Sequence, residues 1–343
     1  MNIIVDPLGH APHLKYVISN NIYFTKESCS GYLNGGHYSS SELLSNFNIN
    51  LQNELLKLQD INNFENMFFV ICTLSTEQRH QGNNYSIWIN MYQNIYNDFI
   101  NKINGKIILI DNHGGDYEPS IYLNKFNFKY DIILKRVYSN RNKDRYLKNT
   151  ISYPFIMDTN NDPCCKLYNL SHYKENIHKK INKIFFAGSL FDYHEEWDNH
   201  NTFEHADRKK IVNGFYSKYP NILEKTRVPY NVFLKTITNY KYALDVRGTS
   251  RLNKRLYEIL TTNTLLLAEK IDIVWPFENN DKFSDECFFE QGNVDDLYRI
   301  YNNFENNFEL YEKCLKNQMY IVNKYFNNEW LWNYINDIIC NID

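Results

Sequence analysis

The sequence predicts an α/β protein with two domains, each a parallel sheet covered by helices. We expect the domains to face each other across a cleft, with a long C-terminal helical segment after the second. Short apolar runs alternate with helix-like segments, which is typical of parallel sheets. The runs are continuously apolar, as in strands covered on both faces. At residues 158–180 a polar, proline-containing stretch interrupts this alternation and predicts a domain linker.

The first domain is expected over residues 1–157. Helix-like segments at Glu42–Leu58 and Ser86–Ile103 separate its strands. The strands are predicted at Ile3–Val5, Met67–Thr73, Lys106–Ile110, Ile132–Leu134 and Ile151–Met157.

The second domain is expected over residues 181–343 and repeats the pattern. Its predicted strands are Lys183–Ala187, Tyr242–Val246, Leu265–Ala268 and Phe288–Phe289. Helices are predicted at about Ala206–Tyr216, at Asn231–Ile237, from Thr249 or Ser250 onward, and after Phe289. A long helical segment, Phe308–Ile339, closes the chain.

The composition excludes several classes of protein. A net charge of −3 argues against nucleic acid or an anionic membrane surface as the main partner. No apolar run approaches the ~20 residues of a membrane helix, and the first residues lack the features of a signal peptide. The seven cysteines form no CxxC pair, and their odd number indicates reduced thiols. We therefore expect a cytoplasmic protein without a transmembrane segment.

The predicted helix after Tyr242–Val246 carries charge on one face. Arg251, Lys254, Arg255 and Glu258 are spaced i, i+3, i+4 and i+7, so they share that face. This face would lie just beyond the carboxyl end of a strand, where it could bind a nucleotide diphosphate. The guanidinium groups would bind the phosphates, and the carboxylate would accept hydrogen bonds from the ribose hydroxyls. The alternative is a solvated helix face with internal ion pairs.

Two other segments could contact the same ligand: a loop that follows a strand, and the start of a helix. Gly188 and Ser189 follow the predicted strand Lys183–Ala187 and would allow a phosphate or sugar to approach the backbone. Arg208 lies at a helix start, where a cation is unfavourable unless an anion neutralises it. The alternative for Gly188 and Ser189 is a plain turn, and the alternative for Arg208 is a solvated basic turn.

Along the chain come a strand followed by Gly188 and Ser189, a helix start with Arg208, the charged helix between two strands, and the C-terminal helical segment. This succession, over roughly residues 183–340, resembles the C-terminal half of GT-B glycosyltransferases. The exostosin-like and CAP10-like group is most similar, together with the broader group-one domain, whose pattern has Arg and Glu three residues apart. Here that pattern reads Arg255-Leu-Tyr-Glu258-Ile-Leu, then Asn263 where the family usually has Gly, then Leu265–Leu267. Asn also tolerates the left-handed conformation after a helix. The N-terminal half matches nothing in detail.

The resemblance implies two Rossmann-like domains and a nucleotide-sugar-dependent hexosyl- or pentosyltransferase with a UDP- or GDP-sugar donor and a glycan or other hydroxyl acceptor. It implies that Arg255 contacts the donor diphosphate and Glu258 the ribose. Further donor-binding residues would be Arg208, Arg247, Arg251 and Tyr257. We find no Asp-x-Asp on a plausible loop, so we expect no metal and no other cofactor.

An inverting enzyme would also need a general base in the opposite domain. The loop after Lys106–Ile110 carries Asp111, His113 and Asp116 around two glycines, and His10 follows the first strand. An ordinary Gly-rich turn with Asp caps is the alternative. His194, His200 and His205 have spacings that fit no common metal motif, so no metal site is predicted.

Two rival functions remain open from the sequence. A sugar-nucleotide epimerase would bind the same donor and need no acceptor groove, and product analysis with an acceptor would separate it from a transferase. A non-catalytic carbohydrate-binding protein would also fit the 16% aromatic content. The intact Arg251, Arg255 and Glu258 face argues against that last reading.

Overall fold

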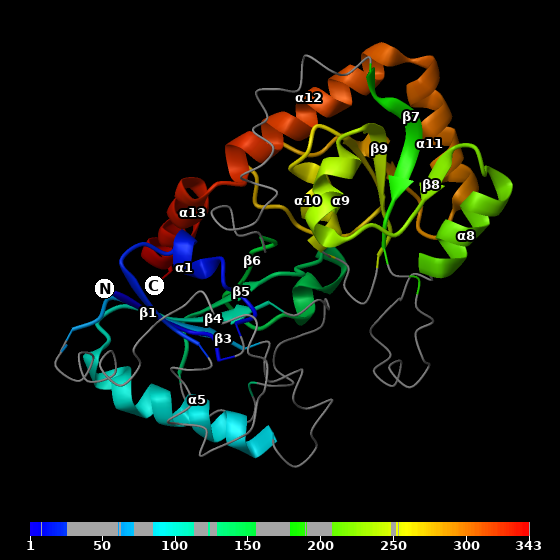
Figure 1. Ribbon diagram of the computed structural model, residues 1–343. Coiled ribbons are helices and arrows are strands. Elements are labelled where there is room, and N and C mark those ends of the chain that lie inside the picture. The colour runs from blue at the N-terminus through cyan, green and yellow to red at the C-terminus, as the bar shows by residue number, and fades with distance from the viewer. Residues whose placement is uncertain are drawn as a thin grey trace.

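The computed structural model describes residues 1–7, 9–25, 61, 63–71, 85–112, 123, 129–155, 179–188, 190, 208–247, 252 and 254–342. These residues form two α/β domains that lie side by side, each around one parallel sheet (Figure 1). The predicted helix Glu42–Leu58, most of the predicted linker, and residues 249 and 250 lie outside the described ranges.

Among the described residues, the N-terminal sheet has six parallel strands in the order β2-β1-β3-β4-β5-β6. Their bounds are Asn2–Val5 (β1), Asn21–Phe24 (β2), Met67–Val70 (β3), Ile107–Asp111 (β4), Ile132–Lys135 (β5) and Thr150–Ser152 (β6). The accompanying helices are Leu14–Val17 (α1), Tyr85–Phe99 (α5) and the 3-10 turns Ile100–Lys102 and Asn140–Arg145. Strand β2 was not predicted, because NIYF is short and alternates little in polarity.

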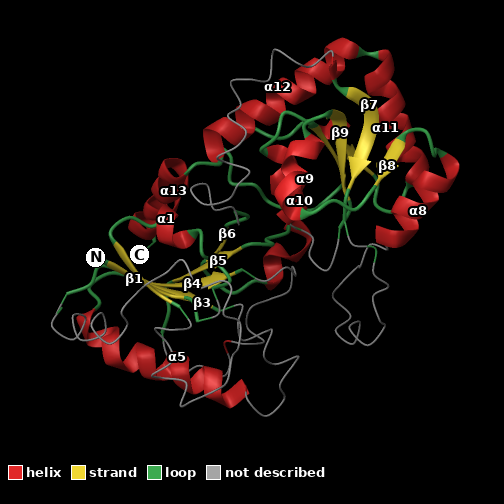
Figure 2. Ribbon diagram, in the orientation of Figure 1, coloured by secondary structure: helices red, strands yellow, loops and turns green. Residues whose placement is uncertain are grey.

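Helices cover both faces of this sheet (Figure 2). In β4, Ile107 and Leu109 pack in the same cluster as α5, whereas Ile108 and Ile110 pack with α1 and the last helix of the chain. Both faces of this strand are therefore buried and shielded from solvent. This explains the continuously apolar strands of the sequence.

In the described part of the second domain, the sheet has five parallel strands in the order β11-β10-β9-β7-β8. Their bounds are Ile181–Phe186 (β7), Leu223–Lys225 (β8), Tyr240–Asp245 (β9), Leu265–Glu269 (β10) and Phe288–Phe289 (β11). The helices are Arg208–Lys218 (α8), Tyr230–Ile237 (α9), Lys254–Leu260 (α10), Asp285–Cys287 (η7, a 3-10 turn), Val294–Asn306 (α11), Phe308–Tyr325 (α12) and Asn328–Asn341 (α13). Helices α9 and α10 pack on one face, α8 and α11 on the other.

The C-terminal helical segment crosses between the domains. It is two helices, because Asn327 interrupts it and caps α13 by accepting a hydrogen bond from the Trp330 backbone N–H at 2.8 Å. Helix α12 packs on the C-terminal domain, and α13 lies against α1 of the N-terminal domain (Figure 1). The Tyr334 hydroxyl donates to the Ser152 carbonyl at 2.7 Å, which fixes α13 to the end of β6.

No helix in the part of the chain that the structure describes is both long enough and apolar enough to cross a membrane.

Candidate active site at the carboxyl ends of the strands

Strand order locates the candidate site. In the C-terminal sheet β7 lies between β8 and β9, so the chain reverses direction across the sheet at β7. In the N-terminal sheet β1 occupies the same kind of position, between β2 and β3. Ligands of open parallel sheets bind outside the carboxyl ends of the strands at such switch points. The residues that follow β7, β9 and β1 are therefore expected to line the ligand site.

Arg247 follows β9 and is held by Glu269 at the end of β10. The Arg247 backbone N–H and Nε both donate to Oε2 of Glu269, at 3.1 and 3.4 Å. The second Glu269 oxygen accepts the Gly292 N–H at 3.1 Å. The pair is buried, with Arg247 4% and Glu269 1% exposed. Among the described residues, Nη2 of Arg247 has no hydrogen-bond partner, so a bound anion would satisfy a buried donor here.

Arg208 and Gly188 lie at the same end of the sheet. Arg208 opens α8, and its Nε donates to the carbonyls of Val246 and Arg247 at 3.1 and 3.2 Å. Gly188 comes shortly after β7, and a Cβ there would lie 2.8 Å from the Phe186 ring. The predicted Arg208, Arg247 and Gly188 are thus gathered at the carboxyl ends of β7 and β9. Ser189 and Arg251 lie outside the described residues.

Two charged residues of α10, Arg255 and Glu258, are packed, whereas Lys254 on the same face is exposed. The Arg255 guanidinium carbon lies 3.8 Å from the Phe233 ring centroid in α9, and Arg255 Nε lies 3.5 Å from Oε2 of Glu258. Glu258 is only 4% exposed. The ring and the carboxylate therefore fix the orientation of the guanidinium.

Tyr257, in the same helix, is turned toward the N-terminal domain. Its hydroxyl donates to the Pro154 carbonyl, and burial raises its pKa. We assign Tyr257 to the contact between the domains rather than to the donor site for which the sequence nominated it.

Asp6 organises the loop after β1. It is fully buried, and its carboxylate accepts hydrogen bonds from His10 N–H at 2.9 Å, Ala11 N–H at 2.7 Å and the Tyr23 hydroxyl at 2.6 Å. Burial raises the pKa of Asp6. From the sequence, the loop from Asp6 to His10 is a candidate for the general base, with His10 as the named residue. The organising role of Asp6 was not predicted, although its position directly after an apolar strand was a signal for a buried carboxylate.

The two loops nominated for the general base are neighbours. Asn112 Nδ2, just after β4, donates to the His10 carbonyl at 2.5 Å. The loop after β1 and the loop after β4 are thereby joined. His113 and Asp116 lie outside the described residues.

Asp111 itself is internal. It pairs with Lys135 at 2.8 Å across the β4–β5 register, and both side chains have no exposed surface. A carboxylate in a closed ion pair is not open to an acceptor, so the geometry favours a structural role for Asp111. Lys135 escaped the sequence analysis, although a lysine ending the apolar run Ile132–Lys135 was a signal for a buried partner.

Arg136 connects the carboxyl ends of the two sheets. Its Nη1 donates to the Asn112 carbonyl at 3.2 Å, and its Nη2 donates to the carbonyl of Leu252, which lies between β9 and α10. The residues after β4 and β5 of one domain therefore adjoin the segment after β9 of the other.

His13 lies in the same region and was also missed. Its ring stacks on Tyr153 with centroids 6.2 Å apart, and Nε2 is buried with no partner among the described residues. Burial, aided by the charge of Arg136, lowers the pKa of His13 to about 3, so the ring is neutral at physiological pH.

The described residues contain no group of three or more His, Cys, Asp or Glu side chains placed to hold a metal ion.

Comparisons with known proteins bear on the fold. No protein-family model matches the sequence, and no curated protein matches it. A solved glycosyltransferase from Rickettsia africae ESF-5 is 11% identical, with a TM-score of 0.51 over 98% of this chain and 97% of that one. A DNA-modifying β-glucosyltransferase is 14% identical, with a TM-score of 0.45 over 99% and 100% of the two chains. T4 phage BGT with UDP-glucose is 14% identical, with a TM-score of 0.43 over 99% of each chain.

With its two parallel-sheet domains, the chain has the GT-B fold, as predicted. The similarity to the Rickettsia africae ESF-5 glycosyltransferase, at a TM-score of 0.51, supports that conclusion.

Proposed function

We propose that this protein is a glycosyltransferase that moves a sugar from a nucleotide-sugar donor to a hydroxyl acceptor. One observation carries the proposal: Nη2 of Arg247 is a buried cationic donor without a partner among the described residues, at the switch point of the C-terminal sheet. Arg208 lies beside it, bonded to the carbonyls of Val246 and Arg247. A diphosphate would supply an acceptor to Nη2 of Arg247, whose Nε is already paired with Glu269, and would neutralise Arg208.

The donor would lie across the carboxyl ends of β7 and β9. Arg247 and Arg208 would bind the diphosphate, and Gly188 would allow close approach of the ligand to the backbone. Arg255 would extend the cationic surface, and Glu258 would accept hydrogen bonds from the ribose hydroxyls. Ser189 and Arg251 remain proposed members of this site.

The reaction needs stabilisation of the departing diphosphate as the bond between the anomeric carbon and the phosphate oxygen breaks. Fixed guanidinium groups supply it in the same way as an oxyanion hole, so we propose a metal-independent transfer. The new bond forms from the acceptor oxygen, whose proton goes to a base. For that role we propose the loop after β4, with Asp116 first and His113 next, and His10 as the neighbouring alternative.

A finer assignment follows from the resemblance of residues 183–340. We propose that the protein is most closely related to the exostosin-like and CAP10-like enzymes, with a UDP- or GDP-sugar as donor and a glycan as acceptor. The packed pair of Arg255 and Glu258 supports the motif on which that resemblance depends.

Thermal melting with UDP, GDP, CMP and their sugars tests the donor class. We expect stabilisation by one nucleoside diphosphate and its sugar, unchanged in EDTA, because protein cations handle the phosphate charge. Incubation with the stabilising sugar nucleotide and candidate acceptors should then release free nucleoside diphosphate. An isomerised sugar nucleotide without transfer would instead indicate an epimerase. No stabilisation by any nucleotide would overturn the proposal.

A further inference from the structure

Arg136 stands on a rigid part of the N-terminal sheet. It directly follows β5, and its backbone N–H donates to the Asp111 carbonyl of β4 at 2.9 Å. The residues on either side of it, Lys135 and Val137, have no exposed surface. Strand pairing and burial therefore fix the main chain at Arg136, and the side chain extends from a fixed base.

The Arg136 guanidinium bridges the two domains through two backbone carbonyls. Nη1 donates to the carbonyl of Asn112, the residue after β4, at 3.2 Å, and Nη2 donates to the carbonyl of Leu252 in the C-terminal domain. Leu252 is fully buried in the core, so packing fixes its position as well. The nitrogens of a guanidinium are held in one plane. Two of them, bound to carbonyls of different domains, therefore fix the separation of those carbonyls.

Asn112 extends this connection to the loop after β1. Its Nδ2 donates to the His10 carbonyl at 2.5 Å, and the His10 N–H donates to the Asp6 carboxylate at 2.9 Å. Arg136 and Asn112 together therefore join the segments after β1, β4 and β5 to the segment that precedes α10. The segments after β1 and β4 carry the proposed bases, and α10 carries part of the proposed donor site.

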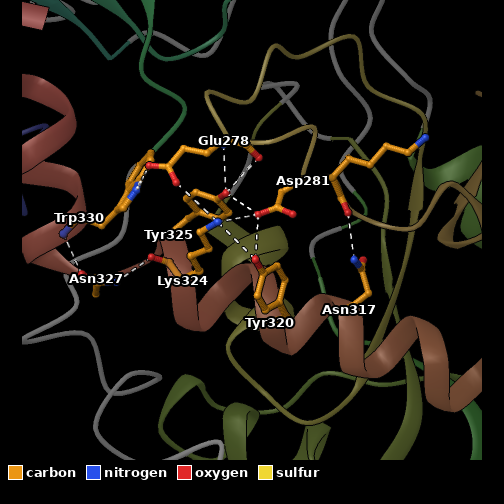
Figure 3. A network of polar contacts seen from close by, with 9 residues as sticks. Glu278, Asp281, Asn317, Tyr320, Lys324, Tyr325, Asn327 and Trp330 are labelled. Carbon is orange, nitrogen blue, oxygen red and sulfur yellow. Dashed lines mark hydrogen bonds and ion pairs between the residues drawn. The ribbon is translucent and has the colours of Figure 1, made fainter. Parts of the chain in front are cut away.

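A second connection between the domains lies at the α12–α13 junction (Figure 3). Asp281 accepts hydrogen bonds from Tyr325 and Lys324 at the end of α12, at 2.6 and 2.9 Å. Glu278 spans the junction, because its carboxylate lies 3.6 Å from Lys324 Nζ and accepts a hydrogen bond from Trp330 Nε1 of α13 at 3.3 Å. Helix α13 packs on α1, so these contacts hold the domains together without using the residues that directly follow β1, β4, β5 or β9.

The two connections differ in what they control. The contacts at the α12–α13 junction attach one domain to the other, so the association of the domains does not depend on Arg136 alone. The Arg136 bridge lies instead between the segments that carry the proposed bases and the segment that leads into α10. It therefore controls the distance between the two sides of the candidate site.

We propose that Arg136 is a positioning residue, which holds the acceptor side of the site at a fixed distance from the donor side. This inference rests on the proposed function. In the transfer, the acceptor oxygen bonds to the anomeric carbon as the bond from that carbon to the phosphate oxygen breaks, and the acceptor proton goes to the base. The rate of such a step depends steeply on the alignment of the reacting atoms, and a displacement of ~1 Å can lower it ~10²-fold. Arg136 acts on these atoms only through Asn112 and Leu252.

Steady-state kinetics and donor titration on three variants test the positioning role. R136M removes both hydrogen bonds and should lower kcat ~10²-fold with donor affinity unchanged, because it alters no donor-binding residue. R136K should recover part of the loss, since an ammonium group can bond to a carbonyl but lacks the planar fork. W330F is the matched control: it breaks the hydrogen bond to Glu278 at the other connection and should keep the wild-type kcat. A wild-type kcat in R136M, or a loss of donor affinity as large as the loss of kcat, would overturn the proposal. If R136M does not fold, the same criteria apply to R136K.

Amide hydrogen exchange tests the bridge without any transfer reaction. In R136M, the peptides that contain Asn112 and Leu252 should exchange faster than in the wild type, whereas peptides from α12 and α13 should not change. In W330F the pattern should be reversed. Unchanged exchange at Asn112 and Leu252 in R136M, in a protein that transfers sugar normally, would overturn the bridge alone. A wild-type protein that binds no nucleotide and transfers no sugar would overturn the proposed function, and the positioning role with it.

Discussion

The Arg247 guanidinium and the Glu269 carboxylate form a buried pair between the ends of two neighbouring parallel strands, with Nε to Oε2 at 3.4 Å and the backbone N–H of Arg247 to the same oxygen at 3.1 Å. The β9–β10 register, in which Asp245 lies opposite Ala268, places Glu269 one residue further toward the carboxyl end and beside the residues that follow β9. The carboxylate thus holds the arginine at the switch point. The pair is the structural basis of the proposed donor site.

Breaking this pair should destabilise the protein. Arg247→Met and Glu269→Gln should each lower the free energy of unfolding by about 3–5 kcal/mol, because each removes one partner of a buried charge pair. The double variant should lose less than the sum of the singles, since neither charge is then left alone. Urea unfolding measures all three.

The matched control is Glu290→Gln. Glu290 pairs with Lys270 at the surface, with 59% and 53% of the two side chains exposed. Exposed pairs contribute about 0–1 kcal/mol, so this variant should unfold nearly as the wild type does. Strict additivity of the Arg247 and Glu269 variants would show that the two residues are not coupled.

Arg255→Ala should weaken binding of the nucleoside diphosphate by about 1.5–3 kcal/mol, the contribution of a charge-assisted hydrogen bond. It should also cost about 0.5–2 kcal/mol of stability, because the guanidinium lies over the Phe233 ring. Calorimetric titration at a temperature where both proteins are folded separates the two effects. Arg299→Ala is the control, since Arg299 is exposed on α11. Equal affinities for wild type and Arg255→Ala would remove Arg255 from the site.

Glu258→Gln should lower affinity for the nucleoside diphosphate and leave affinity for pyrophosphate unchanged. The reason is that pyrophosphate has no ribose hydroxyls to donate to the carboxylate. Titration of both ligands against the variant measures the difference. Equal losses for both would instead make Glu258 a support for Arg255, with which it is paired.

Two aspartates of one segment should behave differently. Asp116→Asn should lower turnover by ~10²–10⁴ with donor binding intact, as expected for a lost general base. Asp111→Asn should instead lower the free energy of unfolding by about 3–5 kcal/mol, because the buried Lys135 charge would lose the Asp111 carboxylate. Steady-state kinetics and urea unfolding on both variants test this pair of expectations. A normal rate for Asp116→Asn would assign the base elsewhere, with His10 next, or indicate a retaining reaction.

Acid should destabilise the protein through His13. Its pKa is lowered from 6.5 to about 3 in the folded state, so between these values the unfolded chain binds a proton that the folded chain does not. Stability is fully present above pH 6.5 and falls as the pH is lowered toward 3, with a slope of up to about 1.4 kcal/mol per pH unit from this group. His13→Gln should remove this component. Parallel curves for wild type and variant, from urea unfolding across this range, would contradict the assignment.

The sequence by itself determined most of the strands and helices and the two-sheet division, because apolar periodicity is a local property. The apolar runs Lys106–Ile110 and Leu265–Ala268 predicted buried strands, which the structure has at Ile107–Asp111 and Leu265–Glu269, and the spacing of Arg255 and Glu258 predicted a shared helix face. The short strand Leu223–Lys225 was missed because three residues carry no period.

Tertiary structure alone decided which distant residues meet. Strand order and register placed Glu269 beside Arg247 and Lys135 beside Asp111. Packing of one domain on the other turned the Tyr257 hydroxyl to the Pro154 carbonyl. The physical reason is that the helical or extended conformation of a residue depends mainly on its neighbours along the chain. The partner of a buried polar group depends instead on which strands pair and which surfaces are buried from solvent.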